Sequence, residues 1–441
     1  MAWILPTTVP EALEFLDSDD EWQRQRGVEG LEALAPLSEQ VISRLIEMLD
    51  DPVRNVRWKT TRVLETIGKE DASVVSAMIA ALQHPSDMVR RWLVEAIARA
   101  AFPDKSAVDA VLEGCTDPSE YVRREAINQF TDKKVEHPHL VWVMVCLLWR
   151  EELHAADVLA RQGNTDSEVI EALIAGLRRS RIDGYCATAL GKLGKVTPEI
   201  TQELFELASS SVSNYGYAVD SRGALVKLIE NSLVVDFLNQ KLLSSITSEA
   251  VTAGLIFAAS GDRRKELCTL FLESLSELED DGKRLVLNAL MPWCESVPEV
   301  TEICGLLLYA KDDEVRLEAA HLLVVMPVYQ SEAISLALEY LCQNYDRSHA
   351  SRAVDVLERL ESLKPEVQYG LLPCFTNPPY TALQARESRE AYSYDFSVRR
   401  PLLYLLMRQE ELIPELMAEI YTLCSEKSVA GNFLRRRFTA E

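Results

Sequence analysis

The stretch Asp51-Pro52-Val53-Arg54-Asn55-Val56-Arg57 decides the fold, because close copies of it follow at intervals of 33 residues. His84-Pro85 leads to Val89-Arg90, and Asp117-Pro118 leads to Val122-Arg123. A period of about 20–50 residues is typical of a stack of small structural units rather than of one globular core. The period therefore predicts an array of helical hairpins packed side by side.

Each copy of the stretch has the pattern of a turn followed by an amphipathic helix. The Asp of the turn suits a helix N-cap, and the Pro suits the first helical position. Counted from the Arg, the residues at plus three, plus four and plus seven are apolar or small, which predicts one buried stripe. These residues are Thr60, Thr61 and Leu64; Leu93, Val94 and Ile97; and Ala126, Ile127 and Phe130.

An apolar segment also precedes two of the turns, at Val41–Leu49 and Val74–Leu82, so the expected unit is helix, turn, helix. This pattern resembles the HEAT-repeat family, whose repeats carry an Asp in the turn and a Val-Arg pair early in the second helix. Asp312-Asp313-Glu314-Val315-Arg316 and Ser397-Val398-Arg399 keep the motif. The resemblance implies an all-α fold, a right-handed α-solenoid superhelix of about twelve HEAT-like hairpins.

Looser copies of the stripe allow twelve anchor positions to be placed, at a mean spacing of about 34 residues. The anchors other than 57, 90 and 123 are Arg24, Glu152, Asp183, Asp220, Glu249, Lys283, Arg316, Ala350 and Arg399. We expect regular N-terminal repeats over 1–150, degenerate repeats over 151–310, and C-terminal repeats over 311–441 with an inserted loop near 377–394 and a basic tail. In the degenerate part, Tyr185 to Gly194 keeps small residues and is similar to the short HEAT-like repeats of bilin lyases.

Composition restricts the partners that can be expected. The formal net charge of −23 makes binding to a nucleic acid unfavourable and favours a basic or neutral protein as partner, because phosphate binding depends on Lys and Arg. The longest apolar run, Leu140–Trp149, has ten residues, whereas a membrane span needs about 20. The nine cysteines occur singly, without a Cys-x-x-Cys motif, which is typical of reduced thiols in a cytoplasmic protein.

Two Glu-x-x-His motifs, Glu151 to His154 and Glu318 to His321, are the sharpest sign of metal chemistry, since paired motifs of this kind form di-iron sites in helix bundles. They are 167 residues apart, however, or about five repeats. The HEAT-like deoxyhypusine hydroxylases carry His-Glu dipeptides, and no histidine here precedes Glu. His137-Pro138-His139 offers only two ligands. We therefore predict no catalytic residue, metal or cofactor.

A set of aromatic and basic residues on the early second helices is the first candidate for binding a partner. Positions plus one, plus two and plus five lie away from the buried stripe, and in HEAT-repeat proteins they line the concave side. The candidates are Trp58, Lys59, Arg62, Arg91, Trp92 and Arg124. Trp and Arg are common at binding hot spots, so an acidic or aromatic-rich peptide suits this surface. The alternative is that both tryptophans fill grooves between repeats.

The Arg of the motif has a structural interpretation instead. In HEAT-repeat proteins it pairs with the turn Asp of a neighbouring repeat, so the resemblance assigns a ladder of contacts to Arg57, Arg90, Arg123 and Arg316. A second candidate surface is the 377–394 loop, with Tyr380, Arg386, Arg389, Tyr392 and Tyr394. An irregular capping repeat is the alternative there.

Taken together, these features favour a non-catalytic scaffold or adaptor that binds a peptide or folded domain. An acidic inhibitor or immunity protein that sequesters a basic toxin or nuclease is the second hypothesis, because acidity would steer association. A HEAT-like enzyme, either a bilin lyase or a DNA-base glycosylase, is the third. Salt dependence of association, a copurifying chromophore or DNA binding would separate the three.

Overall fold

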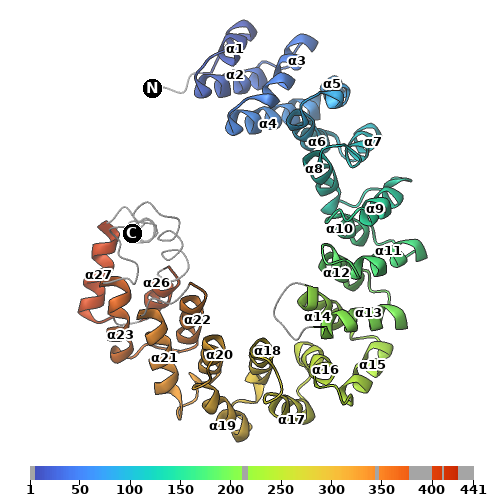
Figure 1. Cartoon of the computed structure of the whole chain (residues 1–441). Helices are drawn as coiled ribbons and strands as arrows, with labels where there is room; N and C mark the ends of the chain where they lie inside the picture. The colour runs from blue at the N-terminus through green and yellow to red at the C-terminus, as the bar shows by residue number, and fades with distance from the viewer. Residues whose placement is uncertain (1–4, 211–216, 343–346, 377–399, 410–411, 426–441) are drawn as a thin grey trace. The chain divides into compact units, whose positions relative to one another are not determined.

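The computed structural model describes residues 5–210, 217–342, 347–376, 400–409 and 412–425. Within these ranges the chain forms helices joined by turns and contains no β-strand, which confirms the all-α prediction (Figure 1). Two compact units are present, Met1–Leu207 with Val219–Val234, and Ala208–Ala218 with Val235–Glu441. Their boundary falls inside the segment 151–310 rather than at either of its ends.

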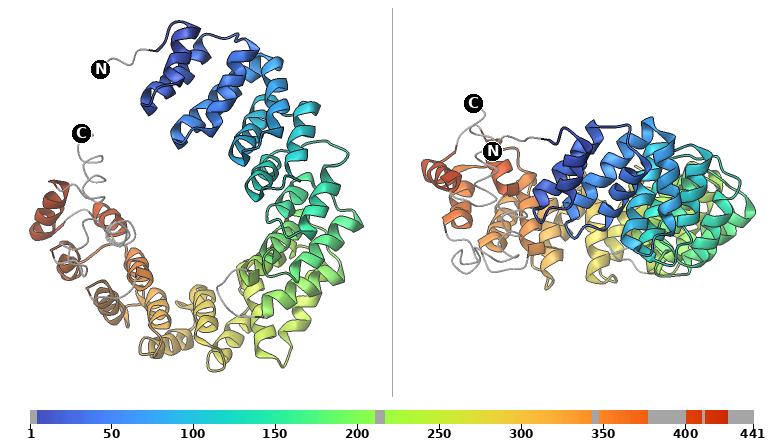
Figure 2. Two further views of the ribbon diagram at one scale, coloured as in Figure 1. Left: turned by 45° about the horizontal axis from the view of Figure 1, so that its top comes forward. Right: turned by 90° about the horizontal axis from the view of Figure 1, so that it is seen from above.

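In the first unit, successive helices alternate between two sides, here called first helices and second helices. The first helices are α1 (Val9–Leu16), α3 (Glu39–Glu47), α5 (Ala72–Ala80), α7 (Lys105–Gly114), α9 (Leu140–Trp149), α11 (Ser167–Leu177) and α13 (Pro198–Ser209). The second helices are α2 (Glu21–Ala33), α4 (Arg54–Glu70), α6 (Asp87–Ala101), α8 (Glu120–Thr131), α10 (Ala155–Gln162), α12 (Asp183–Leu193) and α14 (Tyr217–Leu228). Second helices from α2 to α12 pack on one another in sequence order (Figures 1 and 2).

The second unit continues the same alternation. Its first helices are α15 (Ser232–Leu242), α17 (Lys265–Ser274), α19 (Pro298–Leu307), α21 (Gln330–Cys342) and α23 (Pro365–Thr376), followed by α27 (Pro414–Ser425). Its second helices are α16 (Thr247–Ala259), α18 (Asp280–Leu290), α20 (Asp313–Leu323), α22 (Arg347–Glu358) and α26 (Arg400–Met407). Helix α26 packs on α22, a second helix, and α27 packs on α23, a first helix. The last described helices therefore continue the two rows of first and second helices.

The twelve anchors predict the second helices well. Ten of them lie inside a second helix, and Glu152 lies three residues before α10. The twelfth, Arg399, is outside the described residues and directly precedes α26. The part of the chain that lacks the Val-Arg motif therefore forms the same helix pairs as the part that has it, which shows that the buried stripe carries the fold.

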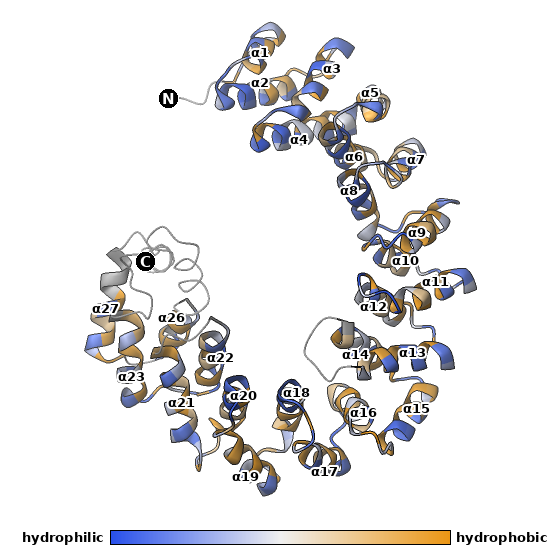
Figure 3. Cartoon of the chain, in the orientation of Figure 1, coloured by the Kyte–Doolittle hydropathy of each residue, from blue (hydrophilic) through white to orange (hydrophobic). Residues whose placement is uncertain are grey.

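The predicted stripe forms the core between the paired helices. All nine of its residues on α4, α6 and α8 are buried, from Thr60 on α4 to Phe130 on α8. Hydrophobic residues, orange in Figure 3, lie mainly where helices contact one another, and hydrophilic residues lie mainly on the sides of each helix that face away from other helices. Burying such residues contributes about 25 cal/mol per Å² of apolar surface, so each pair is stabilised chiefly through its neighbours.

The predicted helix starts are two residues too early. Helix α4 begins at Arg54 with Val53 as its N-cap, and α8 begins at Glu120 with Ser119 as its N-cap. Asp51 and Asp117 stay in the turn, where each carboxylate accepts a hydrogen bond from the backbone N–H two residues later at 2.8 Å. The Asp therefore shapes the turn instead of capping the helix, and its second oxygen remains for another partner.

Small residues bring second helices of the degenerate part into close contact, as predicted for Tyr185 to Gly194. A Cβ atom at Gly191 of α12 would lie 2.9 Å from the Cα of Ala224 on α14. Because real Cβ atoms do not approach other atoms this closely, only glycine allows this spacing of the two helices. Among the described residues, no helix is both long enough and apolar enough to cross a bilayer.

Candidate protein-binding surface

The arginine ladder holds the early second helices in register. Nη1 of Arg90 donates hydrogen bonds to the carbonyl oxygens of His84 (2.8 Å) and Pro85 (3.0 Å) in its own turn. Its Nε and Nη2 donate to the two carboxylate oxygens of Asp117 in the next turn, at 2.8 and 2.9 Å. This bidentate pair is the stronger kind of charge-assisted hydrogen bond and fixes both orientation and distance.

The contact between Arg90 and Asp117 shifts the pKa of both residues in the direction that keeps them charged. Burial alone would raise the pKa of Asp117, but the hydrogen bonds from Arg90 and from the Ser119 N–H outweigh burial, so this pKa lies below its usual value. The Asp117 carboxylate in turn raises the pKa of Arg90. Similar pairs join Arg24 to Asp51 at 2.6 Å and Arg123 to Glu152 at 2.7 Å.

The ladder has a gap at Arg57. Its Nη1 donates to the carbonyl oxygens of Asp51 and Pro52, as the other ladder arginines do in their own turns. The next turn, however, has His84 at the place of the aspartate, and the buried Nε of Arg57 finds no hydrogen-bond partner among the described residues. The Nδ1 of His84 accepts the Ser86 N–H at 3.1 Å, so His84 shapes its turn without pairing with Arg57.

Arg316 in the second unit also departs from the predicted ladder. Its Nη1 donates to the carbonyl oxygen of Ala310 at 2.9 Å, which keeps the contact with its own turn. The contact with the next repeat is to the hydroxyl of Tyr340, which accepts from Nε at 3.1 Å, and an ion pair joins Arg316 to Asp313 of its own turn. The resemblance thus identified the arginine correctly as a turn contact but not its partner.

Aromatic side chains are exposed beside cations on the second helices of the first unit. Trp58 is 49% exposed and Tyr121 is 63% exposed. Arg124 lies over the ring of Tyr121 at 5.8 Å, and Lys59 lies 5.8 Å from the ring of Trp58. We define the aromatic–basic surface by these side chains and their neighbours on α2 to α8: Trp22, Trp58, Lys59, Arg62, Arg91, Tyr121 and Arg124.

Three of the predicted cations on this surface already have acidic partners. Lys59 pairs with Glu29 of α2. Arg62 pairs with Glu65 one turn along α4 at 3.0 Å, and Nε of Arg91 lies 3.3 Å from a carboxylate oxygen of Glu125 on α8. No carboxylate pairs with Arg124 within the ranges that the structure describes. Arg124 is therefore the cation of this surface that is most open to an added acidic group.

Trp92 is placed differently from the prediction. It is only 5% exposed, and the guanidinium of Arg91 lies over its ring at 5.1 Å. Trp92 occupies plus two from its anchor, whereas Trp58 occupies plus one, and this step of one residue rotates a side chain by about 100° on a helix. Trp92 therefore packs within the repeat array and cannot form the contact with a partner that was predicted for it.

A buried carboxylate lies under the same surface. Burial, and then the nearby Glu125, raise the pKa of Glu95 on α6, although the neighbouring Arg99 opposes this shift. Arg99 reaches Glu95 at 2.8 Å along the same helix. The acidic residues of the interior therefore offset part of the positive charge at this surface.

Two members of the aromatic–basic surface were missed in the sequence. Trp22, 49% exposed, and Tyr121 both stand two residues before their anchors, Arg24 and Arg123. Positions minus two and plus one are three residues apart, so they lie on the same side of a helix. Including minus two among the outward positions would have identified both aromatic residues.

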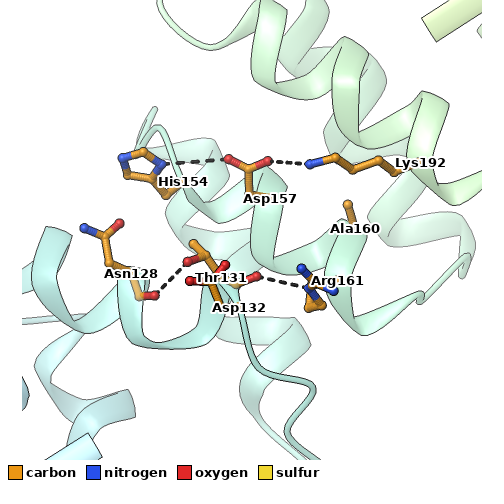
Figure 4. Close-up of a pocket in the computed structure, with 8 residues that line it drawn as sticks. All are labelled: Asn128, Thr131, Asp132, His154, Asp157, Ala160, Arg161 and Lys192. Atoms are coloured by element: carbon orange, nitrogen blue, oxygen red, sulfur yellow. Dashed lines mark hydrogen bonds and ion pairs between the residues drawn. The ribbon is translucent and has the colours of Figure 1, made fainter. Parts of the chain in front are cut away.

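A hollow of about 600 Å³ lies along the second helices, and its lining includes Asn128, about one turn along α8 from Arg124. Asp157 of α10 lies between His154, at 3.8 Å, and Lys192 of α12, at 3.2 Å, and Nε of Arg161 donates to the carbonyl oxygen of Thr131 (Figure 4). The walls are thus polar and carry both signs of charge. The lining residues are Asn128, Thr131, Asp132, His154, Asp157, Ala160, Arg161 and Lys192.

The remaining candidate sites from the sequence are the 377–394 loop and the two Glu-x-x-His motifs. The residues of the 377–394 loop, Tyr380, Arg386, Arg389, Tyr392 and Tyr394, lie outside the described residues. His154 of the first Glu-x-x-His motif lines the hollow, while Glu318 and His321 belong to the second unit. Across the described parts of the chain, no three His, Cys, Asp or Glu residues form a group that could hold a metal ion.

Comparison with known proteins gives one family match and several likenesses of fold. A model of HEAT repeats matches residues 75–130, from α5 to α8. No curated protein matches the chain. Among solved structures, the chain is 12% identical to a chain in the structure of Kap95p binding to RanGDP, with a TM-score of 0.48, covering 95% of this chain and 64% of that one.

Two further solved structures resemble this chain to a similar degree. Kap121p bound to Nup53p is 12% identical, with a TM-score of 0.43, and 97% of this chain and 52% of that chain are covered. Yeast importin-β (Kap95p) is 14% identical, with a TM-score of 0.43, and 97% of this chain and 68% of that chain are covered. This chain spans about half to two thirds of the length of these structures. At these identities and TM-scores, none of the likenesses indicates what this chain binds.

The segment of the family match contains two of the turns with their ladder arginines, Arg90 and Arg123. The helix pairs before and after it have the same alternation of first and second helices and the same buried stripe. Residues 75–130 therefore match HEAT repeats, and the described helix pairs before and after them share the same architecture, an α-solenoid of HEAT-like helix pairs.

Proposed function

We propose that this chain is a cytoplasmic, non-catalytic scaffold or adaptor that binds another protein through the aromatic–basic surface. One observation carries the proposal: Trp58 and Tyr121 are 49% and 63% exposed on second helices of one stacked array, each beside a cation, and Trp22 is 49% exposed on another second helix of that array. Exposing large aromatic side chains to water is unfavourable, and clusters of Trp, Tyr and Arg are typical of binding hot spots.

The chemistry of the surface favours a partner segment that carries acidic and aromatic or aliphatic side chains. Trp58 and Tyr121 offer ring faces, and Arg124 offers a guanidinium without a carboxylate partner among the described residues. A carboxylate placed against Arg124 would gain a charge-assisted hydrogen bond without breaking an existing ion pair. The neighbouring hollow has room for a side chain of the same segment.

An acidic inhibitor of a basic protein is the second candidate, because the net charge is −23. The sign of a charge reversal separates the two. Arg124→Glu would weaken binding of an acidic segment and would strengthen binding of a basic partner to the same surface. The enzyme hypotheses are third, and a copurifying chromophore or binding to duplex DNA at physiological salt would support them.

The test is tagged purification from the native cell, with a variant of the surface beside a matched control. Trp58→Ala/Arg124→Glu changes the aromatic–basic surface. Trp142→Ala/Arg150→Glu makes the same chemical changes on and just after α9, a first helix, where Trp142 is 61% exposed. We expect the first variant alone to reduce recovery of a stoichiometric partner at least tenfold, the loss that about 1.4 kcal/mol of binding free energy produces.

Equal recovery with both variants would show that the aromatic–basic surface is not the binding site. Loss with the α9 variant alone would move the site to the first-helix side. Circular dichroism of both variants must match that of the parent, because only then does a lost partner report a lost contact.

A further inference from the structure

Two cysteines of adjacent repeats meet where α21 and α23 pack together. The approach is set by Gly370 of α23, because a Cβ atom there would lie only 2.5 Å from Cδ1 of Leu338 on α21. One helical turn further along each helix stand Cys342 and Cys374. Leu338 and Gly370 each stand four residues before one of these cysteines, and each cysteine sulfur also contacts the other helix, so the two cysteines come together as well.

The two thiols contact each other's helix. The Sγ of Cys342 lies 3.6 Å from the carbonyl oxygen of Gly370, and the Sγ of Cys374 lies 3.8 Å from the carbonyl oxygen of Leu341. The side chains of Cys342 and Cys374 are also within hydrogen-bonding distance of each other. Cys342 is exposed and Cys374 is fully buried, so one thiol is accessible to solutes and the other is protected behind it.

The pair differs chemically from the other cysteines. The hydrogen bond from Cys374 lowers the pKa of Cys342 to about 7, although burial opposes this shift. Burial instead raises the pKa of Cys186 and of Cys304 to about 12. Since the thiolate is the form that reacts with oxidants, Cys342 combines accessibility with reactivity near neutral pH.

We propose that Cys342 and Cys374 form a peroxide-sensitive pair that closes to a disulfide between α21 and α23. The Cys342 thiolate attacks one oxygen of hydrogen peroxide, the O–O bond breaks, and Cys342 becomes a sulfenic acid while hydroxide leaves and takes a proton. The Cys374 sulfur then attacks Sγ of Cys342 and loses its proton, the S–O bond breaks, and water leaves. The two sulfurs together lose two electrons, which reduce one peroxide to two waters.

This disulfide would close a loop that contains the whole of α22, and it would connect the first helices of two neighbouring repeats. The two repeats could then not separate while the bond lasts. The bond would be reversible, because thiol reductants return a disulfide to two thiols. The repeats that precede the 377–394 loop would thus be held together under oxidising conditions and released under reducing ones.

The first test uses the full, reduced chain treated with hydrogen peroxide, then denatured, alkylated with N-ethylmaleimide and analysed by mass spectrometry. We expect two of the nine thiols to escape alkylation, a mass loss of about 2 Da before alkylation, and one peptide pair linking Cys342 to Cys374. Dithiothreitol should restore both thiols. Cys146 on α9, which is partly exposed and separate from this pair, is the internal control. If Cys342 and Cys374 are alkylated at a peroxide dose that oxidises Cys146, the proposal is wrong.

A second test separates the two roles. In Cys374→Ser, peroxide should leave a sulfenic acid at Cys342 that dimedone traps, and Cys342→Ser should show neither product. The pH midpoint of Cys342 alkylation should also rise toward the ordinary thiol value in a Cys374→Ser variant of unchanged helicity. A disulfide from Cys342 to any other cysteine, or no dimedone adduct in Cys374→Ser, would contradict the assigned pair. The alkylation midpoint of the parent chain tests the same point without a substitution.

Discussion

Single residues decide how tightly two neighbouring repeats are joined, and His84 is the clearest case. Arg24 and Arg90 each make two hydrogen bonds to the aspartate of the next turn, at Asp51 and Asp117. Arg57 has the same geometry toward its own turn but meets His84 in the next one, and its Nε is left without a partner among the described residues. A buried donor without a partner costs about 1–3 kcal/mol, so this junction is weaker than its neighbours.

His84→Asp should therefore stabilise the first unit, by about 1 kcal/mol, because the new carboxylate would accept from the Ser86 N–H and from Arg57 together. The change is measured as a higher urea midpoint by circular dichroism. Asp117→His is the matched control and should lower the midpoint by a similar amount, since it creates the same gap below Arg90. No gain from His84→Asp would mean that water already satisfies Arg57.

Glu95 gives a pH-dependent prediction. Burial and Glu125 raise its folded pKa above the unfolded value, so its protonated form suits the fold better than its charged form. Stability from this group is complete below about pH 4.5 and is lost as the pH rises through the folded pKa. Glu95→Gln should then be more stable than the parent at pH 7, by less than about 1 kcal/mol, and equal to it near pH 4. Urea midpoints at both pH values test this, and a loss at pH 7 would show that the Arg99 contact dominates.

At the level of helices, the distance between second helices depends on where glycine stands. Gly191 of α12 faces Ala224 of α14 at a separation that leaves no room for a Cβ, whereas Gly223, also on α14, has no atom within 4 Å of the place where a Cβ would stand. The same residue type therefore has opposite roles in neighbouring helices: one glycine permits packing, and the other only loosens its helix.

The same substitution should accordingly have opposite effects at these two sites. Gly191→Ala should destabilise the first unit by about 1–3 kcal/mol, because α12 and α14 must move apart. Gly223→Ala should stabilise it by about 0.5–1 kcal/mol, because alanine favours the helix and meets nothing. Thermal unfolding of the two variants beside the parent is the measurement. Effects of the same sign would show that helix propensity outweighs packing in this part of the chain.

At the scale of the whole molecule, the chain forms two compact units, and within each unit the helix pairs pack on neighbours in sequence, as α6 does on α8 and α20 does on α22. A change in one repeat should therefore act locally.

Net acidity and exposed cations occur in the same molecule. The chain carries a net charge of −23, yet Arg124 and the rings of Trp58 and Tyr121 are exposed on second helices of the first unit. Charge summed over the chain thus says little about any one surface.

Arg90→Ala should test this locality. We expect amide hydrogen exchange to become faster in α6 and α8, where the bonds to Asp117 are lost, and to stay unchanged in α18 and α20. Hydrogen exchange with mass spectrometry of the full chain gives both results in one experiment. Equal acceleration in all four helices would show that the chain opens as a single cooperative body.

The sequence by itself determined the repeat period, the position of almost every second helix and the buried stripe, because these depend on periodicity within one helix. Only the tertiary structure decided which outward side chains are exposed and which partners the arginines have. Trp58 and Trp92 look alike in the sequence, yet one is exposed and the other is buried. Cys342 and Cys374 are 32 residues apart and likewise meet only when two repeats stack. These properties depend on contacts between repeats, whose distances and angles are set by the packing of all their side chains rather than by the pattern of any one helix.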